Sequence, residues 1–296
     1  MNRQHIVAQL LLRSWPFPRG AGRIVDRVFS GLVFEQNVAT VRSTDGFQMR
    51  VMPNELVGRH IYLTGEFDRT TVEVLCNFAK PGDVLLDVGA NVGYVSACFL
   101  QNVPDAKVVS VEPQPGIVEL LRSNLAQFGD GRYKVVPVAL SDQDREAWFE
   151  ICDGNRGASK LVAEQNGRAV AVETWSGSRL FSSLAIDQLD LVKLDVEGHE
   201  ETVFRGCKSA LERLQPRAIL FEQHAKMSAP DGPIGRLLDA IGYRVFGIKK
   251  RLASVALVPI TAAEDCKFVD YIAVSRKRDI PKRALGIYGS TLSTLS

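Results

Sequence analysis

The stretch from Val84 to Tyr94 reads VLLDVGANVGY, an apolar run with one acid that is followed by a turn with two glycines. The run at 84–88 is typical of a parallel strand that is buried on both faces. Gly89 and Gly93 suit a tight turn from this strand into a helix. Because ligands bind outside the carboxyl ends of the strands in open α/β sheets, this turn is the first candidate for a binding site.

The composition is that of a globular protein without a strong overall charge. The chain has 296 residues, of which 46% are hydrophobic, and this is enough for one large domain or two ordinary ones. Its 36 lysines and arginines and 34 aspartates and glutamates give a net charge of +2, so no overall field attracts nucleic acid. The five cysteines are scattered and form no CxxC pair, which favours reduced thiols and a cytoplasmic location.

The first apolar segment, Ile6 to Leu12, is much shorter than the roughly 20 residues that a bilayer span needs. It is followed by Trp15-Pro16-Phe17-Pro18 rather than by a small-residue cleavage site, which argues against a signal peptide. We expect a short helix that packs on the body of the protein or on a partner. Weak contact with a membrane surface is the remaining alternative.

A regular alternation of strands and helices begins after residue 60 and predicts a doubly wound, mostly parallel sheet in an α/β domain. Residues 1–60 lack this alternation, and we expect them to form a small N-terminal cap with a hairpin that turns at Asp45-Gly46. The domain is expected to span residues 61–275, and the tail at 276–296 is expected to be disordered. The expected strands are 84–88, 107–112, 133–138, 189–194, 217–221, 243–246 and 268–274, and the expected helices are 67–78, 93–102, 115–128, 199–214 and 234–241.

The segment from Ser141 to Leu184 interrupts the alternation. Two strand-like stretches, 147–152 and 169–174, flank the polar loop 153–160. We expect an insertion that lies over the edge of the sheet or over the mouth of the ligand site.

The glycine spacing in the turn bears on the choice of cofactor. A dinucleotide-binding turn has the pattern GxGxxG, but the position of its middle glycine is Asn91 here. S-Adenosylmethionine has no phosphate, and Asp87, Gly89 and Asn91 suit its sulfonium, amino and carboxylate groups. Glu112 ends the second expected strand, where an acid can accept both ribose hydroxyls of an adenosine. Each residue also has a purely structural interpretation: Asn91 would cap a tight turn, and Glu112 would be a surface glutamate.

The stretch KLDVEGHEE at 193–201 is the most polar one attached to an expected buried strand. Period-two alternation puts Lys193 and Asp195 on the same face, with Glu197 just beyond the strand end. Lys193 serves either in the function or simply to neutralise Asp195. His199 is a candidate general base for a hydroxyl proton, and the alternative is a histidine at a helix start without a chemical task.

Four other polar residues near this edge are interpreted either as structural or as additional members of the site. Glu200 and Glu201 lie in the first turn of the expected helix, where the helix dipole favours acids. Glu222 and His224 follow the fifth strand and are candidates to complete a substrate or metal site. No sequential metal-binding motif is present, so a divalent metal is not expected.

A set of short motifs follows in order from about residue 62 to residue 225. They are GEF at 65–67, PGD at 81–83, DVGANVGY at 87–94, VEP at 111–113, Asn124, ALS at 139–141, ASKL at 158–161, VKLDVEGHE at 192–200, FRG at 204–206 and FE at 221–222. Together they resemble the FkbM family of S-adenosylmethionine-dependent methyltransferases. Two positions depart from the family pattern: Thr174-Trp175-Ser176 replaces a Thr-Leu-Asp pattern, and His199 stands where a small residue is common.

The resemblance implies a class I methyltransferase (Rossmann-like) sheet with an antiparallel last strand, and an enzyme that methylates a hydroxyl of a sugar, glycan or secondary metabolite. Such a reaction is an in-line displacement, so the protein mainly has to position the hydroxyl and accept its proton. We expect Asp195, Glu197 and His199 at the reacting centre. The residues expected to bind S-adenosylmethionine are Glu66, Asp87, Gly89, Ala90, Asn91, Gly93, Glu112, Ala139 and Asp195.

Two other function classes stay open. An NAD-dependent oxidoreductase would use the same sheet, although the missing middle glycine argues against it. A non-catalytic binding module would keep the fold without activity, which the intact Asp87, Glu112 and Asp195 argue against. We expect a small-molecule or glycan acceptor and no nucleic-acid partner.

Overall fold

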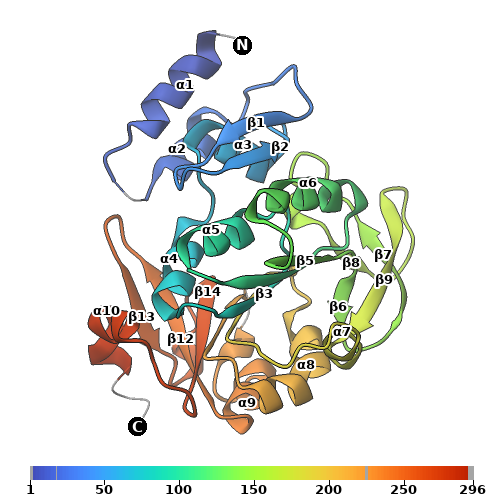
Figure 1. Cartoon of the computed structure of the whole chain (residues 1–296), viewed down its shortest axis with the longest axis vertical. Helices are drawn as coiled ribbons and strands as arrows, with labels where there is room; N and C mark the ends of the chain where they lie inside the picture. Colours follow the sequence, from blue (N-terminus) through green and yellow to red (C-terminus); the bar gives the residue numbers. More distant parts are fainter. Residues whose placement is uncertain (1–2, 18, 224–225, 293–296) are drawn as a thin grey trace.

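The computed structural model describes residues 3–17, 19–223 and 226–292, and a large twisted sheet lies at its centre (Figure 1). The strands of this sheet are β3 (Val84–Val88), β4 (Lys107–Val111), β5 (Tyr133–Val136), β10 (Leu191–Leu194), β11 (Ala218–Glu222), β12 (Tyr243–Lys250), β13 (Val255–Pro259) and β14 (Asp270–Ser275). Their order is β13-β12-β14-β11-β10-β3-β4-β5. The five strands from β11 to β5 in this order run parallel, whereas β14 is antiparallel to both of its neighbours. The predicted mostly parallel sheet with an antiparallel last strand is confirmed.

Helices cover both faces of this sheet. They are α4 (Arg69–Phe78), α5 (Tyr94–Asn102), α6 (Pro115–Leu125), α7 (Gly177–Ser183), α8 (Glu200–Leu214) and α9 (Pro233–Ala240), with the short 3₁₀ helices η1 (Ala126–Phe128), η3 (Lys226–Ser228) and η4 (Ala263–Asp265). On β3, Leu85 packs into the core beneath α4, α5 and α6, whereas Leu86 and Val88 pack into the core beneath α7, α8 and α9. The apolar run of β3 is therefore buried on both faces, as predicted, and the domain is doubly wound.

The N-terminal cap consists of α1 (Arg3–Arg13), α2 (Ala21–Val28), β1 (Ala39–Arg42), β2 (Gln48–Val51) and α3 (Leu56–Thr64). The antiparallel pairing of β1 with β2 confirms the predicted hairpin. α1 is the expected short helix. It packs on α3 of the cap, because Ala8 and Leu12 are buried and Gln9 Nε2 donates to Tyr62 O at 2.9 Å. Among the described helices, none has both the length and the apolar character needed to cross a bilayer.

Asn124 of α6 joins the cap to the glycine turn after β3. Its Oδ1 accepts a hydrogen bond from Arg50 N at 2.7 Å, and its Nδ2 donates to Val92 O at 2.8 Å. The side chain is almost fully buried, so water does not compete for these hydrogen bonds. The cap is thereby fixed against the turn.

The expected insertion forms a second, smaller sheet beside the first one. Its elements are β6 (Ala139–Ser141), β7 (Arg145–Glu150), η2 (Arg156–Ala158), β8 (Lys160–Val162) and β9 (Ala169–Ser176), and the strand order is β6-β9-β7-β8. Arg156 ties the insertion to the cap, because its N and Nε donate to the two carboxylate oxygens of Glu55 at 3.0 and 3.2 Å. Cap and insertion therefore meet, and both contribute walls to the cavity described below.

The prediction of a disordered tail at 276–296 is wrong for most of that segment. Lys282–Leu292 forms helix α10, and Ala284, Tyr288 and Leu292 are buried against the core. These side chains recur every four residues, which puts them on one face of the helix. Asn77 Nδ2 donates to Tyr288 Oη at 3.2 Å and anchors α10 to α4. Residues 293–296 lie outside the described part of the chain.

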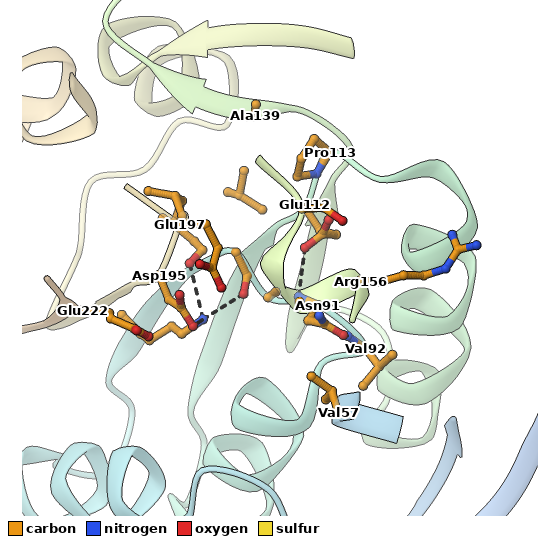
Figure 2. Close-up of a pocket in the computed structure, with 18 of the residues that line it drawn as sticks. Val57, Asn91, Val92, Glu112, Pro113, Ala139, Arg156, Asp195, Glu197 and Glu222 are labelled. Carbon is orange, nitrogen blue, oxygen red and sulfur yellow. Dashed lines mark hydrogen bonds and ion pairs between the residues drawn. The ribbon is translucent and has the colours of Figure 1, made fainter. Parts of the chain in front are cut away.

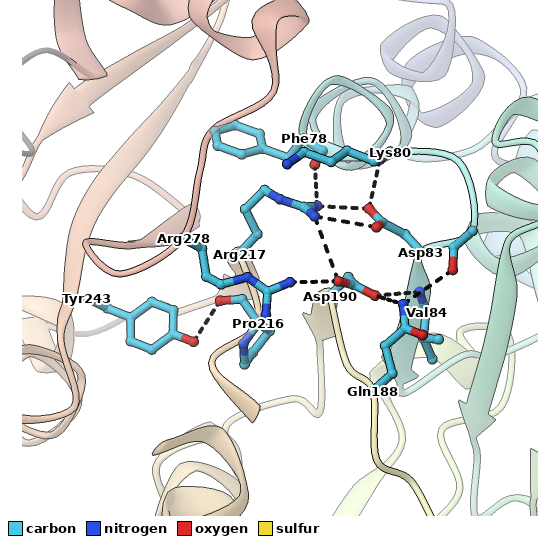
Figure 3. A network of polar contacts seen from close by, with 11 residues as sticks. Phe78, Lys80, Asp83, Val84, Gln188, Asp190, Pro216, Arg217, Tyr243 and Arg278 are labelled. Carbon is cyan, nitrogen blue, oxygen red and sulfur yellow. Dashed lines mark hydrogen bonds and ion pairs between the residues drawn. The ribbon is translucent and has the colours of Figure 1, made fainter. Parts of the chain in front are cut away.

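A buried ionic network holds the amino ends of the central strands together (Figure 3). Arg217, just before β11, donates to Asp83 Oδ2 at 2.8 Å and to Phe78 O at 2.9 Å. Asp190, just before β10, lies 3.7 Å from Arg217 and accepts a hydrogen bond from Arg278 at 2.9 Å. The network leaves the opposite, carboxyl edge of these strands for the candidate site.

Candidate functional site

The turn after β3 uses up its own backbone donors. Each N–H group from residue 89 to residue 93 donates within the protein: Gly89 and Ala90 to Val111 O (2.9 and 3.1 Å), Asn91 to Glu112 Oε2 (2.9 Å), Val92 to Asn91 Oδ1 (2.7 Å) and Gly93 to Ala90 O (2.9 Å). Phosphate-binding turns rely on backbone N–H groups that point at the ligand. This turn is therefore not built to cradle a pyrophosphate.

Packing explains both glycines of the turn. Gly89 has φ +73°, and a Cβ there would lie 1.8 Å from Asp195 O, which belongs to the segment after the neighbouring strand β10. Gly93 has φ +85°, and a Cβ there would lie 2.5 Å from Leu121 Cδ1 of α6. The GxxxG spacing thus lets β3 and α5 approach their neighbours closely.

A cavity of about 220 Å³ opens at the carboxyl edge of β3, β4 and β10, and we call it the first cavity. The insertion and the cap close it from the outside, and apolar side chains such as Val111, Pro113 and Val138 line part of its wall. Figure 2 shows Asp195, Glu197 and Glu222 gathered in one part of it and Asn91 with Glu112 in another. Of the predicted site residues, those that line it are Gly89, Ala90, Asn91, Glu112, Ala139, Asp195, Glu197 and His199.

Glu112 is a buried carboxyl group with two backbone donors. Its Oε2 accepts from Asn91 N at 2.9 Å, and its Oε1 accepts from Gln114 N at 3.0 Å. Burial raises the pKa of Glu112 to about 7, and these two N–H donors offset part of that rise. Each oxygen keeps a second lone pair, so the carboxylate can still accept hydrogen bonds from the hydroxyl groups of a ligand.

Lys193 lies beneath the turn between two acids. Its Nζ donates to Gly89 O at 2.7 Å and lies 3.5 Å from both Asp87 Oδ1 and Asp195 Oδ2. Burial alone lowers the pKa of Lys193, but Asp195 and Asp87 outweigh burial, so the net pKa is raised above its usual value. The expected pairing of Lys193 with Asp195 is present, and the lysine also neutralises Asp87.

The turn from β10 into α8 places Glu197 and His199 at the first cavity. Glu197 adopts a left-handed φ of 53°, and Glu200 holds the turn because its Oε1 accepts from Val196 N and Gly198 N at 3.2 and 3.1 Å. His199 Nε2 lies 3.0 Å from Ser141 Oγ. Burial lowers the pKa of His199 below 6.5, so its imidazole is mainly neutral at pH 7 and can accept a proton.

Three predicted cofactor residues lie away from the wall of the first cavity. Asp87 is fully buried below the turn, where Ser96 Oγ donates to its Oδ2 at 2.6 Å. Gly93 lies inside the turn against α6. Glu66 lines a second cavity of about 450 Å³ that adjoins the first one. Asp87 and Gly93 therefore contact other parts of the protein and not the space of the first cavity.

Sequence reasoning missed several residues that line the first cavity. Phe67 and Asp68 follow Glu66 directly, so the GEF motif was the available signal for them. Arg156 comes from the insertion, where no pattern identifies it. Glu222, by contrast, was named from the sequence as a candidate to complete a substrate or metal site. It lines both cavities, and burial followed by the charges of Asp195 and Asp270 raises its pKa to about 8.

The candidate metal site at Glu222 and His224 lies only partly within the described residues. Within the ranges 3–17, 19–223 and 226–292, no group of three or more His, Cys, Asp or Glu side chains is arranged to hold a metal ion. His224, which we named with Glu222 for such a site, lies outside the described residues.

The sheet order, the antiparallel β14 and a ligand cavity at the carboxyl edge of β3 and β4 define a class I methyltransferase fold. The family model described as "Methyltransferase FkbM domain" matches residues 87–245, which is just over half of the chain. The chain belongs to this family. The family resemblance drawn from the motifs is confirmed.

Two curated relatives are similar over a little more than half of this chain. The hexuronic acid methyltransferase AglP of Haloferax volcanii is 31% identical over 170 residues, which cover 57% of this chain and 66% of AglP. The 2-O-methyltransferase NoeI of Sinorhizobium fredii is 24% identical over 187 residues, which cover 57% of this chain and 75% of NoeI. The chain therefore spans just under two thirds of the first relative and three quarters of the second.

Among solved structures, a TehB-like SAM-dependent methyltransferase from Corynebacterium glutamicum matches with a TM-score of 0.40 and 11% identity. The match covers 73% of this chain and 92% of that protein.

Proposed function

We propose that this protein is an S-adenosylmethionine-dependent O-methyltransferase that acts on a hydroxyl of a sugar, glycan or secondary metabolite. The family membership supports methyl transfer, and the residues of the first cavity support this cofactor.

The observation that supports this cofactor is the combination of the closed turn and Glu112. The five N–H groups at 89–93 are already used, which disfavours a dinucleotide with its pyrophosphate. Glu112 lies at the end of β4, where its free lone pairs suit two ribose hydroxyls. The used N–H groups disfavour the NAD-dependent alternative, whereas Glu112 suits the ribose of either cofactor.

The residues of the first cavity fit S-adenosylmethionine. Val111, Pro113 and Val138 offer an apolar wall for an adenine ring, and Glu112 offers acceptors for the ribose. Asn91 and Ala90 bound the cavity at the turn, and Asp195 supplies a negative charge for a cationic group. When bound, this cofactor supplies an electrophilic methyl group on a sulfonium.

The protein's own task in such a transfer is to position a hydroxyl and to take its proton. His199 is mainly neutral at pH 7 and faces the first cavity, so it can accept a proton. Asp195 and Glu197 lie on the same edge and can orient the hydroxyl through hydrogen bonds. We assign His199 as the general base and the two acids as orienting groups.

The names of the two relatives support a carbohydrate acceptor. AglP is named for a hexuronic acid, and NoeI is named for a 2-O position. We use the names of these two relatives to propose the class of the acceptor, and not its identity.

The test is transfer of a labelled methyl group from S-adenosylmethionine to a panel of free and lipid-linked sugars, with and without EDTA. We expect a methyl ether on one acceptor class and equal rates in EDTA. Binding of the cofactor without transfer to any hydroxyl acceptor would instead support the non-catalytic module. A variant with Asp195 replaced by Asn should bind the cofactor more weakly and transfer more slowly. The matched control is Asp187→Asn, which changes an exposed aspartate that lines neither cavity.

A further inference from the structure

The second cavity adjoins the first one and has the larger volume, about 450 Å³ against about 220 Å³. The two share the residues Phe67, Asp68, Asp195 and Glu222. The outer walls of the second cavity come from α2 and α3 of the cap on one side and from the end of β12 with the following turn on the other. A molecule in the second cavity would thus reach the first cavity across a shared acidic boundary.

The boundary between the cavities is rich in groups that bind hydroxyls. Asp68, Asp195 and Glu222 line both cavities, and Glu66 adds a further carboxyl group to the second one. Ionised carboxylates accept hydrogen bonds from hydroxyls, whereas a protonated one also donates. Glu222, with its pKa raised to about 8 mainly by burial, is mostly protonated at pH 7. This boundary offers both acceptors and a donor to a polyhydroxylated molecule.

The outer rim of the second cavity carries both cations and acids, and most of its cations already have partners. Arg19 pairs with Glu73, Arg69 pairs with Asp45, and Lys250 Nζ lies 2.6 Å from Asp270 Oδ2. These pairs compensate the charges within the protein. Two further arginines of the rim, Arg23 and Arg251, do not belong to these pairs.

Arg23 of α2 and Arg251 after β12 line the second cavity and are exposed. Neither guanidinium forms a hydrogen bond or an ion pair with any residue in the described part of the chain. The two elements meet, because a Cβ on Gly20 at the start of α2 would lie 3.4 Å from Leu252 Cδ1. Guanidinium groups bind carboxylates and phosphates through paired N–H donors.

We propose that the second cavity binds the methyl acceptor, and that this acceptor is a carbohydrate with a carboxylate or phosphate group that Arg23 and Arg251 hold. The hydroxyls of the acceptor then face Asp68, Asp195 and Glu222 at the boundary with the first cavity. That the bound molecule is a methyl acceptor rests on the proposed function. Its binding can be measured without turnover.

The experiment is a titration of the full chain, saturated with S-adenosylhomocysteine, with D-glucuronate, D-glucose 6-phosphate and D-glucose. We expect at least one of the two anions to bind more tightly than glucose, and the comparison of the two separates a carboxylate from a phosphate site. Arg23→Gln and Arg251→Gln should each weaken anion binding about tenfold, since a hydrogen bond to a charged group is lost. The control is Arg213→Gln, which changes an exposed arginine of α8 that lines neither cavity.

The inference is overturned if neither anion binds more tightly than glucose, or if the double variant Arg23→Gln/Arg251→Gln binds the anions as the unchanged protein does. Both arginines are exposed, so their replacement leaves the fold intact, and a thermal melt checks this. Failure of S-adenosylhomocysteine to bind the unchanged protein would contradict the proposed function instead. The two failures are therefore distinguishable.

Discussion

Replacement of Lys193 by methionine should strongly destabilise the protein, because it removes the cation between two acids. Methionine keeps the length and apolar stem of the side chain but loses the contacts of Nζ at 2.7 Å to Gly89 O and at 3.5 Å to Asp87. Asp87 is 0% exposed and would be left as a buried charge without a cation. Removal of one partner from a buried ion pair costs about 3–5 kcal/mol. The side chain of Asp195 is 36% exposed and adds little to this cost.

The assay is urea unfolding at pH 7, followed by tryptophan fluorescence, with the exposed Lys208→Met as control. The acids keep the net pKa of Lys193 above that of an unfolded lysine, so its contribution is fully present below about pH 10 and is lost as pH rises further. A second substitution, Asp87→Asn, should recover part of the loss because it removes the uncompensated charge. A loss of less than about 1 kcal/mol, the value typical of an exposed pair, would refute the reasoning.

Three further predictions concern other parts of the molecule. The pKa of Glu112 is about 7, and hydroxyl donors of a ligand favour its ionised form. S-Adenosylhomocysteine should therefore bind about tenfold more weakly at pH 6 than at pH 8 in calorimetry, and Glu112→Gln should abolish this difference. His199→Ala should lower kcat about 100-fold with little change in cofactor Kd, and the kcat of the unchanged protein should fall as pH drops through the lowered pKa; an unchanged kcat removes His199 as the base. Arg217→Met should lower the free energy of unfolding by about 3–5 kcal/mol in urea and leave cofactor affinity of the folded protein unaltered, because the network lies at the opposite edge of the strands.

The central strands could be predicted because their burial leaves a direct mark on the sequence. The apolar run of β3 was predicted with its observed bounds, since both faces of that strand are covered. The helix α10 was missed because the exposed apolar residues Leu285 and Ile287 stand between the buried Ala284, Tyr288 and Leu292, so the apolar residues do not mark one face. β13 was also missed, since its place is set by pairing with β12.

The candidate site was predictable as a set of strand ends but not as a set of contacts. Parallel strands bring Glu112, Asp195 and the turn after β3 to one edge, and all of these line the first cavity. The sequence does not specify which way a polar side chain points, and Asp87 lies beneath the turn because the β3–β10 register sets it beside Lys193. Glu66 lines the second cavity, which exists only because the cap folds back against the β12–β13 turn.

The measurement that tests the central claim most directly is a calorimetric titration of the full chain with S-adenosylhomocysteine and, separately, with NAD. The account predicts one S-adenosylhomocysteine site per chain, weakened by Glu112→Ala, and no binding of NAD, because the N–H groups at 89–93 are already used. Binding of NAD without S-adenosylhomocysteine, or S-adenosylhomocysteine affinity that Glu112→Ala leaves unchanged, would contradict the assignment of the first cavity to the methyl donor.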